Sequence, residues 1–216
     1  MSGPVRFPVD FRVYRRYEEL TRWEAFVHKH FPEREIPSKK KERNWLHREV
    51  DPVLLQDPEF VVLHEQFRTK IDLGIKLIEA AIAHKLRFSV LLFDGWYLAE
   101  ELVQVAKRRK KDWISILKKN RNLETNSFVL KDAAGQPIKM EGPHIAVQDL
   151  VALIPATAYR EIKVGEKSYW TFTLRVRIPS LGKVRIVISS EHADLSGTYV
   201  TLVTNRVDWS AQKIIA

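Results

Sequence analysis

The run Phe88-Ser-Val-Leu-Leu-Phe93, with the residues Asp94-Gly-Trp-Tyr97 after it, decides which fold we expect for this chain. A short, continuous and mostly apolar run is typical of a central strand that is buried on both faces of an α/β sheet. The run ends abruptly at an aspartate followed by a glycine, and that pair favours a turn. We therefore predict a central strand over residues 88–93 and a turn at 94–97.

Helical patterns lie on both sides of this strand. The residues before it, 67–86, carry isoleucines at helical spacing, at Ile71, Ile75, Ile78 and Ile82. After the turn, a second helix with Val105 and Ala106 on its inner stripe leads to a second short strand over 113–117. Alternating helices and strands with short links are typical of an α/β fold. We expect both strands in one sheet, with the helix over 67–86 packed on it.

The N-terminal part of the sequence shows two other patterns. Apolar residues alternate with other residues over 5–14, which predicts a further strand of the same sheet. Residues 17–31 have helical spacing and stop before Pro32, so we predict one helix there. The charged stretch 37–43 is open to two interpretations, a solvated linker or a loop that contacts phosphates.

Strand patterns dominate the C-terminal part. Three elements are predicted there from polarity, over residues 128–140 (a hairpin), 145–154 (a short helix or an extended link) and 199–204 (a strand). Residues 170–178 and 184–188 alternate in polarity on either side of a turn, which predicts an antiparallel hairpin with one apolar and one partly basic face. Ser210 is placed to cap a short helix from Ala211.

The composition narrows the class of protein. The 216 residues include 36 Lys and Arg against 27 Asp and Glu, a formal charge of +9, and no Cys. Without cysteine there is no disulfide framework and no thiolate metal site. No apolar run reaches the roughly 18–20 residues that cross a bilayer, and no secretory signal follows the N-terminus. We therefore expect a soluble, cytoplasmic protein without membrane contact, and a polyanionic partner such as nucleic acid.

Asp94 is the candidate catalytic and metal-binding residue. It follows a predicted buried strand, at the carboxyl edge where α/β sheets hold their ligands. A carboxylate beside Gly95 suits a hard divalent cation such as Mg²⁺. The alternative is that Asp94 caps the helix that follows it, since aspartate is a favoured N-cap residue. A two-metal site needs further acidic ligands, and no other acid is compelling by its position: Asp10, Glu100, Glu101, Asp112, Glu191, Asp194 and Asp208.

Two basic clusters flank the strand predicted at 113–117. Eight of the fifteen residues from Lys107 to Arg121 are basic, namely Lys107, Arg108, Arg109, Lys110, Lys111, Lys118, Lys119 and Arg121. Clusters at the two ends of one short strand lie close together and suit a phosphate backbone, which predicts DNA binding. The first cluster is also open to another interpretation, cations placed favourably at the end of a helix. Asp112, between the clusters, is most simply an ion-pair partner.

Four blocks of the sequence, in this order, resemble the DDE transposases of insertion sequences. They are Phe7-Pro-Val-Asp-Phe-Arg-Val-Tyr14, the second-aspartate block from Phe93 to Arg121, the hairpin from Trp170 to Ile188, and Leu202-Val-Thr-Asn-Arg206 with Asp208-Trp-Ser210. The resemblance implies an α/β fold with a partial RNase H-like mixed sheet, interrupted by a β-rich insertion before the final glutamate. It assigns residues 1–121 to the catalytic core, 122–198 to the insertion, and 199–216 to the return to the core.

The resemblance carries over one catalytic residue, because only Asp94 matches a position of the family's triad. In the family, the first aspartate lies on a strand before the one predicted at 5–14, and the glutamate lies on the helix that begins here at Ser210. The resemblance therefore implies a transposase fragment that is truncated at both ends and inactive alone. In intact relatives three carboxylates bind two Mg²⁺ ions for DNA strand cleavage and transfer.

The partner that the resemblance implies is DNA, as transposon ends and as target, with a homodimer as a further candidate assembly and a DNA-associated location. Two other hypotheses stay open. In one, the chain is a non-catalytic DNA-binding remnant that regulates an intact transposase. In the other, it is a basic α/β protein that binds a partner without any nucleic-acid role.

Overall fold

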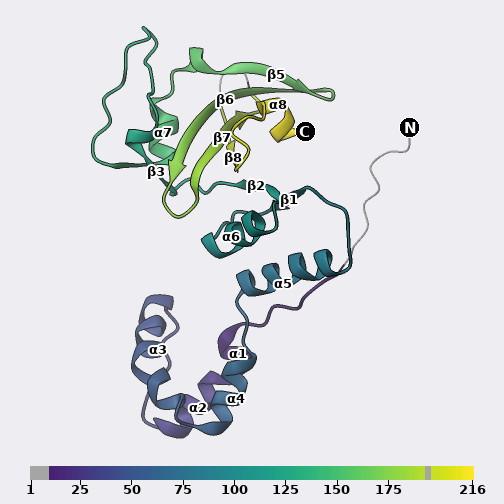
Figure 1. Cartoon of the computed structure of the whole chain (residues 1–216). Coiled ribbons are helices and arrows are strands. Elements are labelled where there is room, and N and C mark those ends of the chain that lie inside the picture. Colours follow the sequence, from purple (N-terminus) through teal and green to yellow (C-terminus); the bar gives the residue numbers. More distant parts are fainter. Residues whose placement is uncertain (1–9, 193–195) are drawn as a thin grey trace. The chain divides into compact units, whose positions relative to one another are not determined.

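The structure is a computed structural model of the chain, and it describes residues 10–192 and 196–216. The chain divides into two compact units, Met1–His84 and Lys85–Ala216 (Figure 1). The described part of the first unit is helical, and the second unit holds a mixed sheet with helices, so the α/β class is confirmed. Among the described helices, none has the length and apolar character that crossing a membrane requires.

Five helices make up the described part of the first unit: α1 (Tyr17–Thr21), α2 (Trp23–His30), α3 (Lys40–Leu54), α4 (Pro58–Gln66) and α5 (Lys70–Ala83). The prediction of one helix over 17–31 is wrong, because the helix is interrupted at Arg22. This residue has a left-handed backbone conformation, with φ of 55°, and it ends α1 where α2 begins. The charged stretch 37–43 is not a linker throughout, since α3 begins inside it.

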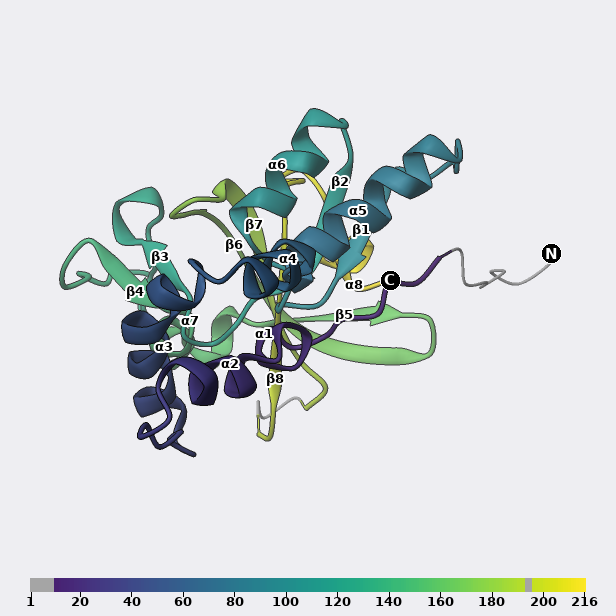
Figure 2. The ribbon, with the colours of Figure 1, turned by 90° about the horizontal axis from the view of Figure 1, so that it is seen from below.

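Helices α1 to α4 lie together in both views of the chain (Figures 1 and 2). The apolar side chains buried among them come from α2, α3 and α4: Trp23, Phe26, Val27, Leu46, Val50, Leu54 and Phe60. The N-terminus of α5 is fixed by Thr69 and Asp72, whose side chains and backbone N–H groups cap one another. Helix α5 is found where we predict it, but none of its side chains is fully buried. Its packing on the sheet would involve both units and stays a prediction.

A six-stranded sheet forms the centre of the second unit, in the order β1-β2-β8-β7-β6-β5. Its strands are β1 (Val90–Phe93), β2 (Asp112–Ile116), β5 (Arg160–Val164), β6 (Lys167–Ile178), β7 (Gly182–Ser190) and β8 (Tyr199–Thr204). Strands β1 and β2 are parallel and are joined by α6 (Glu100–Arg108), whereas the other neighbours in this sheet are antiparallel. The strand–helix–strand unit, the hairpin over 170–188 and the strand over 199–204 are therefore confirmed.

The predicted central place of the first strand is wrong. Within the described residues, β1 has one neighbour, β2, and forms an edge of the sheet. Leu92 on this strand is 76% exposed. A short apolar run does not reveal how many neighbours a strand has. Residues 10–14, where the alternation predicts the end of a strand, form none, and residues 5–9 lie outside the described ranges.

Helices cover the two faces of the sheet unequally. On one face, α6 and α7 (Val147–Leu153) help to bury the larger core, which includes Trp113, Leu150 and Ile186. On the other face, α8 (Ala211–Ile215) covers a smaller cluster with Val187 and Trp209. Figure 1 shows α7 and α8 on opposite sides of β6 and β7. The sheet therefore separates two apolar layers of different size.

The segment between β2 and β5 is less regular than the sequence suggests. Strands β3 (Asn122–Glu124) and β4 (His144–Ala146) pair in a separate two-stranded sheet, and α7 follows β4 directly. The hairpin predicted over 128–140 has one isolated bridge, between Lys131 and Pro137. At the C-terminal end of the chain, Ser210 Oγ accepts the N–H of Lys213 (3.2 Å), which confirms the predicted cap of α8. The domain boundaries at 121 and 198 stay predictions.

Candidate functional site

Asp94 lies at the carboxyl end of β1, directly after the last residue of the strand, and it is exposed. Its Oδ1 accepts the backbone N–H of Trp96 (2.9 Å), and its C=O accepts the N–H of Tyr97 (2.9 Å). Helix α6 begins later, and its N-cap residue, Ala99, offers no side-chain bond. The alternative that Asp94 caps this helix is therefore wrong. Asp94 instead stabilises the turn that follows β1.

Gly95 holds this turn close to the second strand. A Cβ atom on Gly95 would lie 2.7 Å from the C=O oxygen of Ile116, which is the last residue of β2. Real Cβ atoms do not come so close to a backbone oxygen, so any larger residue would displace the turn. The glycine thus positions Asp94 and Trp96 on either side of it, beside the segment that carries the second basic cluster.

Cations and aromatic rings are interleaved in the second basic cluster. Trp96 is 70% exposed, and Lys118 Nζ lies 3.9 Å from the centroid of its ring. Lys119 Nζ lies 4.7 Å from the ring centroid of Tyr199 at the start of β8. Burial, together with the nearby charge of Asp149, raises the pKa of the Tyr199 hydroxyl, so this ring stays neutral at physiological pH. Exposed aromatic rings beside cations are common in sites for single-stranded nucleic acids, whereas cations alone suit the backbone of a duplex.

Arg121, the last cation of this cluster, makes a different contact. Its Nη2 donates to Ser180 Oγ (3.3 Å) in the turn between β6 and β7. The first cluster precedes β2 and the second follows it, so the two clusters flank this strand as the sequence predicts, and their closeness in space stays a prediction. The basic side chains that follow one another in the sequence therefore contact different elements of the folded unit.

The first basic cluster is the C-terminal end of α6. Arg108 is the last helical residue and Arg109 the C-cap. Lys110 is left-handed (φ 52°), with its N–H donating to the C=O of Lys107, and Lys111 N–H donates to the C=O of Ala106. These two bonds are those of a Schellman motif. The cations thus lie where the helix dipole favours them, as the alternative interpretation holds.

A pocket of about 520 Å³ opens beside this helix end. It is lined by three lysines of the first cluster, Lys107, Lys110 and Lys111, by Asp112 and Trp113 of β2, and by Lys183 of β7. Asp112 Oδ2 accepts a hydrogen bond from Arg206 Nη1 (2.9 Å), so the predicted role of Asp112 as an ion-pair partner is confirmed. Lys183 was not among the predicted site residues. The sequence feature that could have identified Lys183 as a site residue is its position on the basic face of the predicted hairpin.

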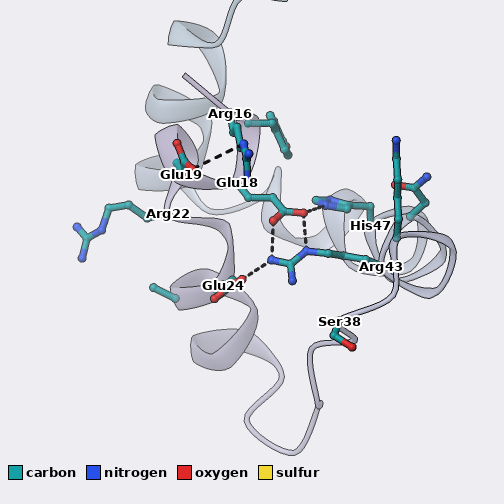
Figure 3. A pocket seen from close by; sticks show the side chains of 12 residues that line it. Arg16, Glu18, Glu19, Arg22, Glu24, Ser38, Arg43 and His47 are labelled. Carbon is teal, nitrogen blue, oxygen red and sulfur yellow. Dashed lines mark hydrogen bonds and ion pairs between the residues drawn. The ribbon is translucent and has the colours of Figure 1, made fainter. Parts of the chain in front are cut away.

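A second charged site lies in the first unit, in a pocket of about 760 Å³ (Figure 3). Glu18 of α1 accepts hydrogen bonds from Arg43 Nε (2.7 Å) and from His47 Nε2 (2.9 Å), both on α3. Arg43 also pairs with Glu24 of α2. The hydrogen bond from Arg43 is the largest cause of the lowered pKa of the Glu18 carboxyl, and Glu18 and Glu24 raise the pKa of the guanidinium.

His47 connects this network to the buried core. Its Nδ1 lies 3.1 Å from Asp51, and its ring centroid lies 4.0 Å from that of Trp23, whose Nε1 donates to Asp51 (2.6 Å). Burial, with a smaller contribution from Asp51, raises the pKa of the Tyr17 hydroxyl to about 12. Each of these charged groups already has an opposite charge or a hydrogen-bond partner. We therefore interpret the network as a support for the packing of α1, α2 and α3, which sequence patterns did not reveal.

A two-metal site needs several carboxylates within reach of both ions. In the described ranges, no group of three or more His, Asp or Glu side chains is placed to hold a metal ion. Asp94 supplies one carboxylate, with one oxygen already engaged by Trp96 N–H, so the described residues do not fit two Mg²⁺ ions. Magnesium binding stays a prediction from the resemblance. In comparisons with known proteins, no family model matches the chain and no curated protein matches it.

Proposed function

We propose that this chain binds duplex DNA through the two basic clusters around β2, as part of a transposase core of the DDE type. The observation that carries the proposal is the surface at the carboxyl end of β1 and β2. There the exposed turn of Asp94 and Trp96 faces Lys118, and Lys119 lies on Tyr199. The cations would neutralise phosphates of the duplex backbone.

The proposal also includes a specific fold, the RNase H-like fold, and a specific family, the DDE transposases. Their support is the parallel unit β1–α6–β2 with Asp94 directly after its first strand, together with the four sequence blocks that resemble the family. The proposed role of Asp94 is that of the one carboxylate that matches the family triad, to which the described residues add no further metal ligands. A DNA-associated location follows from the same proposal.

DNA binding is tested by titrating labelled duplex DNA with the protein at three salt concentrations. If about four phosphate contacts form, log affinity falls with log salt at a slope of roughly −3 to −4. The variant with Lys118, Lys119 and Arg121 replaced by Ala flattens that slope by about one unit per lost contact, without a change of sequence preference. Identical slopes for wild type and variant would show that these residues do not touch DNA.

The catalytic part is tested by nicking of supercoiled DNA with Mg²⁺ or Mn²⁺, with Asp94→Ala as the reference. The expected result is no nicking above that reference, because a two-metal reaction needs several carboxylates and one position of the family triad matches this chain. Nicking that depends on Asp94 would assign strand cleavage to the chain itself. It would also reject the hypothesis of a non-catalytic DNA-binding remnant.

A further inference from the structure

The hairpin of β6 and β7 holds like charges directly opposite one another. Arg175 is opposite Arg185, and Arg177 is opposite Lys183. The residues between them, such as Val176 and Val184, are buried in the core, so the cations share the other face of the hairpin. Like charges in direct cross-strand pairs destabilise a sheet. The hairpin thus maintains an arrangement that a bound anion would stabilise.

The described contacts of the arginine pair are with neutral oxygens. Arg175 Nε and Arg185 Nη1 both donate to the C=O of Val207, at 3.0 and 3.2 Å, and Arg185 Nη2 donates to Thr173 Oγ1 (3.1 Å). Burial and the charge of Arg175 lower the pKa of the Arg185 guanidinium, while Asp208 acts in the opposite direction. The carboxylate of Asp208 is itself held by Arg206 (2.7 Å). The positive charges of Arg175 and Arg185 are therefore not balanced by the contacts described above.

Lys183 connects this hairpin to the end of α6, because it lines two pockets. One pocket, of about 490 Å³, is lined by Arg175, Arg177 and Lys183 together with Glu124, Asn126 and Ser127. The other is the 520 Å³ pocket beside α6. A residue shared by two pockets makes their walls continuous. Six cations therefore form one surface, which we call the hairpin track: Lys107, Lys110, Lys111, Arg175, Arg177 and Lys183.

Two carboxylates lie along the same walls as the six cations of the track, so the cations outnumber them three to one. Asp112 is already engaged by Arg206. Glu124 lines the pocket of about 490 Å³ that also contains Arg175, Arg177 and Lys183. The cations come from segments that lie about 70 residues apart in the sequence, so no single charge run reveals the track. A row of cations with few carboxylates is suited to successive phosphates of a nucleic-acid backbone.

We propose that the hairpin track binds phosphates of duplex DNA and extends the DNA contact from the end of α6 across Lys183 onto β6 and β7. This inference rests on the proposed function and adds residues that the two sequence clusters do not contain. Two residues of the second cluster are placed differently, because Lys118 and Lys119 lie on aromatic rings, whereas Arg121 reaches the turn of the hairpin at Ser180. The two surfaces can therefore be tested by separate variants.

The experiment compares three triple-alanine variants of the full chain in titrations of labelled duplex DNA at several salt concentrations. The first replaces Arg175, Arg177 and Lys183 of the track. The second replaces Lys118, Lys119 and Arg121. The control replaces three exposed lysines of the same unit, Lys131, Lys139 and Lys163, so that all three variants lose the same charge. The track variant is expected to lose at least about tenfold in affinity and to flatten the salt slope by up to about three units, with the control close to wild type.

The outcomes separate this inference from the function on which it rests. A track variant that behaves like the control, while the second variant loses affinity, overturns the track and leaves DNA binding by the cluster intact. A wild type that does not bind duplex DNA at physiological salt overturns both. Inorganic polyphosphate serves as a second ligand: a loss of polyphosphate binding without a loss of DNA binding would identify a small-anion site and contradict the proposal.

A single substitution distinguishes lost contacts from a damaged fold. Lys183→Glu places a carboxylate opposite Arg177, so the cross-strand pair becomes attractive. The expected result is an unchanged or higher melting temperature together with weaker DNA binding. Lys163→Glu, at an exposed position of β5, serves as the charge-matched control and should retain more of the affinity. Equal losses for the two substitutions would contradict a local role for Lys183.

Discussion

The two units use charged side chains in opposite ways. In the pocket of the first unit, Glu18 faces Arg43 and His47, so each charge meets its opposite. On the hairpin of the second unit, Arg175 faces Arg185 directly and no carboxylate stands between them in the strand register. A paired network can support packing without a ligand, whereas a row of like charges gains from an external anion. The contrast is the reason why we propose binding by the second unit and structural support in the first.

The largest effect is expected where the paired network meets the core of the first unit. Trp23 is fully buried, stacks on His47 and donates to Asp51. Trp23→Ala should lower the free energy of unfolding of this unit by about 3–5 kcal/mol, because it leaves a cavity and an unmatched acceptor. Trp45→Ala on α3 is the control, since Trp45 is 64% exposed, and it should stay within about 0.5 kcal/mol of wild type. Exchange protection of the α2 and α3 amides measures both, and equal losses would contradict the assigned core.

A smaller effect, dependent on pH, is expected at Glu18. In the fold its pKa lies below the ordinary value of 4.5, chiefly because Arg43 donates to it. A depressed folded-state pKa means that the stabilisation is present above about pH 4.5 and is lost as the pH falls through the folded value. Glu18→Gln should therefore cost about 1–2 kcal/mol at pH 7, and the difference from wild type should shrink as the pH falls below the ordinary value of 4.5.

The control for this pH dependence is Glu19→Gln, one residue along the same helix. Glu19 is 65% exposed and meets Arg16 at the limit of an ion pair, 4.0 Å. Its loss should leave the unfolding curve unchanged between pH 7 and pH 3. Urea unfolding followed at several pH values measures both variants. A constant difference between Glu18→Gln and wild type at all pH values would show that packing, and not charge, accounts for the loss.

Local patterns predict much of the second unit because its strands have clear polarity. The alternation around Trp170 and Val184 reports one buried face, and that signal depends on neighbouring residues alone. The edge position of β1 is not predictable in the same way, because it depends on which other segment pairs with it. The break at Arg22 is hidden for a related reason, since a left-handed arginine leaves no mark in the hydrophobic pattern.

The same distinction between local sequence features and long-range contacts applies to the residues of the candidate site. Asp94 and the cluster from Lys107 to Lys111 stand out in the sequence because a turn signal and a charge run are local features. The hairpin track does not stand out, because Lys183 joins the end of α6 only through the strand order of the folded sheet. The network of Glu18 and His47 is equally hidden, since its residues lie 29 positions apart.

The smallest expected effect comes from relieving backbone strain in each unit. Lys110 ends α6 in a left-handed conformation and Arg22 separates α1 from α2 in the same conformation, with φ of 52° and 55°. Glycine adopts this conformation without the Cβ penalty but loses more freedom on folding, so Lys110→Gly and Arg22→Gly should each gain about 0.5–1 kcal/mol. Thermal unfolding followed by circular dichroism measures these gains.

DNA affinity should then distinguish the two glycine variants. Each removes one positive charge and gains similar stability, so general charge and stability effects are matched. Lys110 lines the pocket of the hairpin track, whereas Arg22 lines the pocket of the paired network. Lys110→Gly should therefore weaken DNA binding and flatten the salt slope by about one unit, while Arg22→Gly leaves the slope unchanged. Equal slopes for the two variants would mean that Lys110 and Arg22 both contact DNA or that neither does, and in either case the division of roles between paired and unpaired charges would not hold.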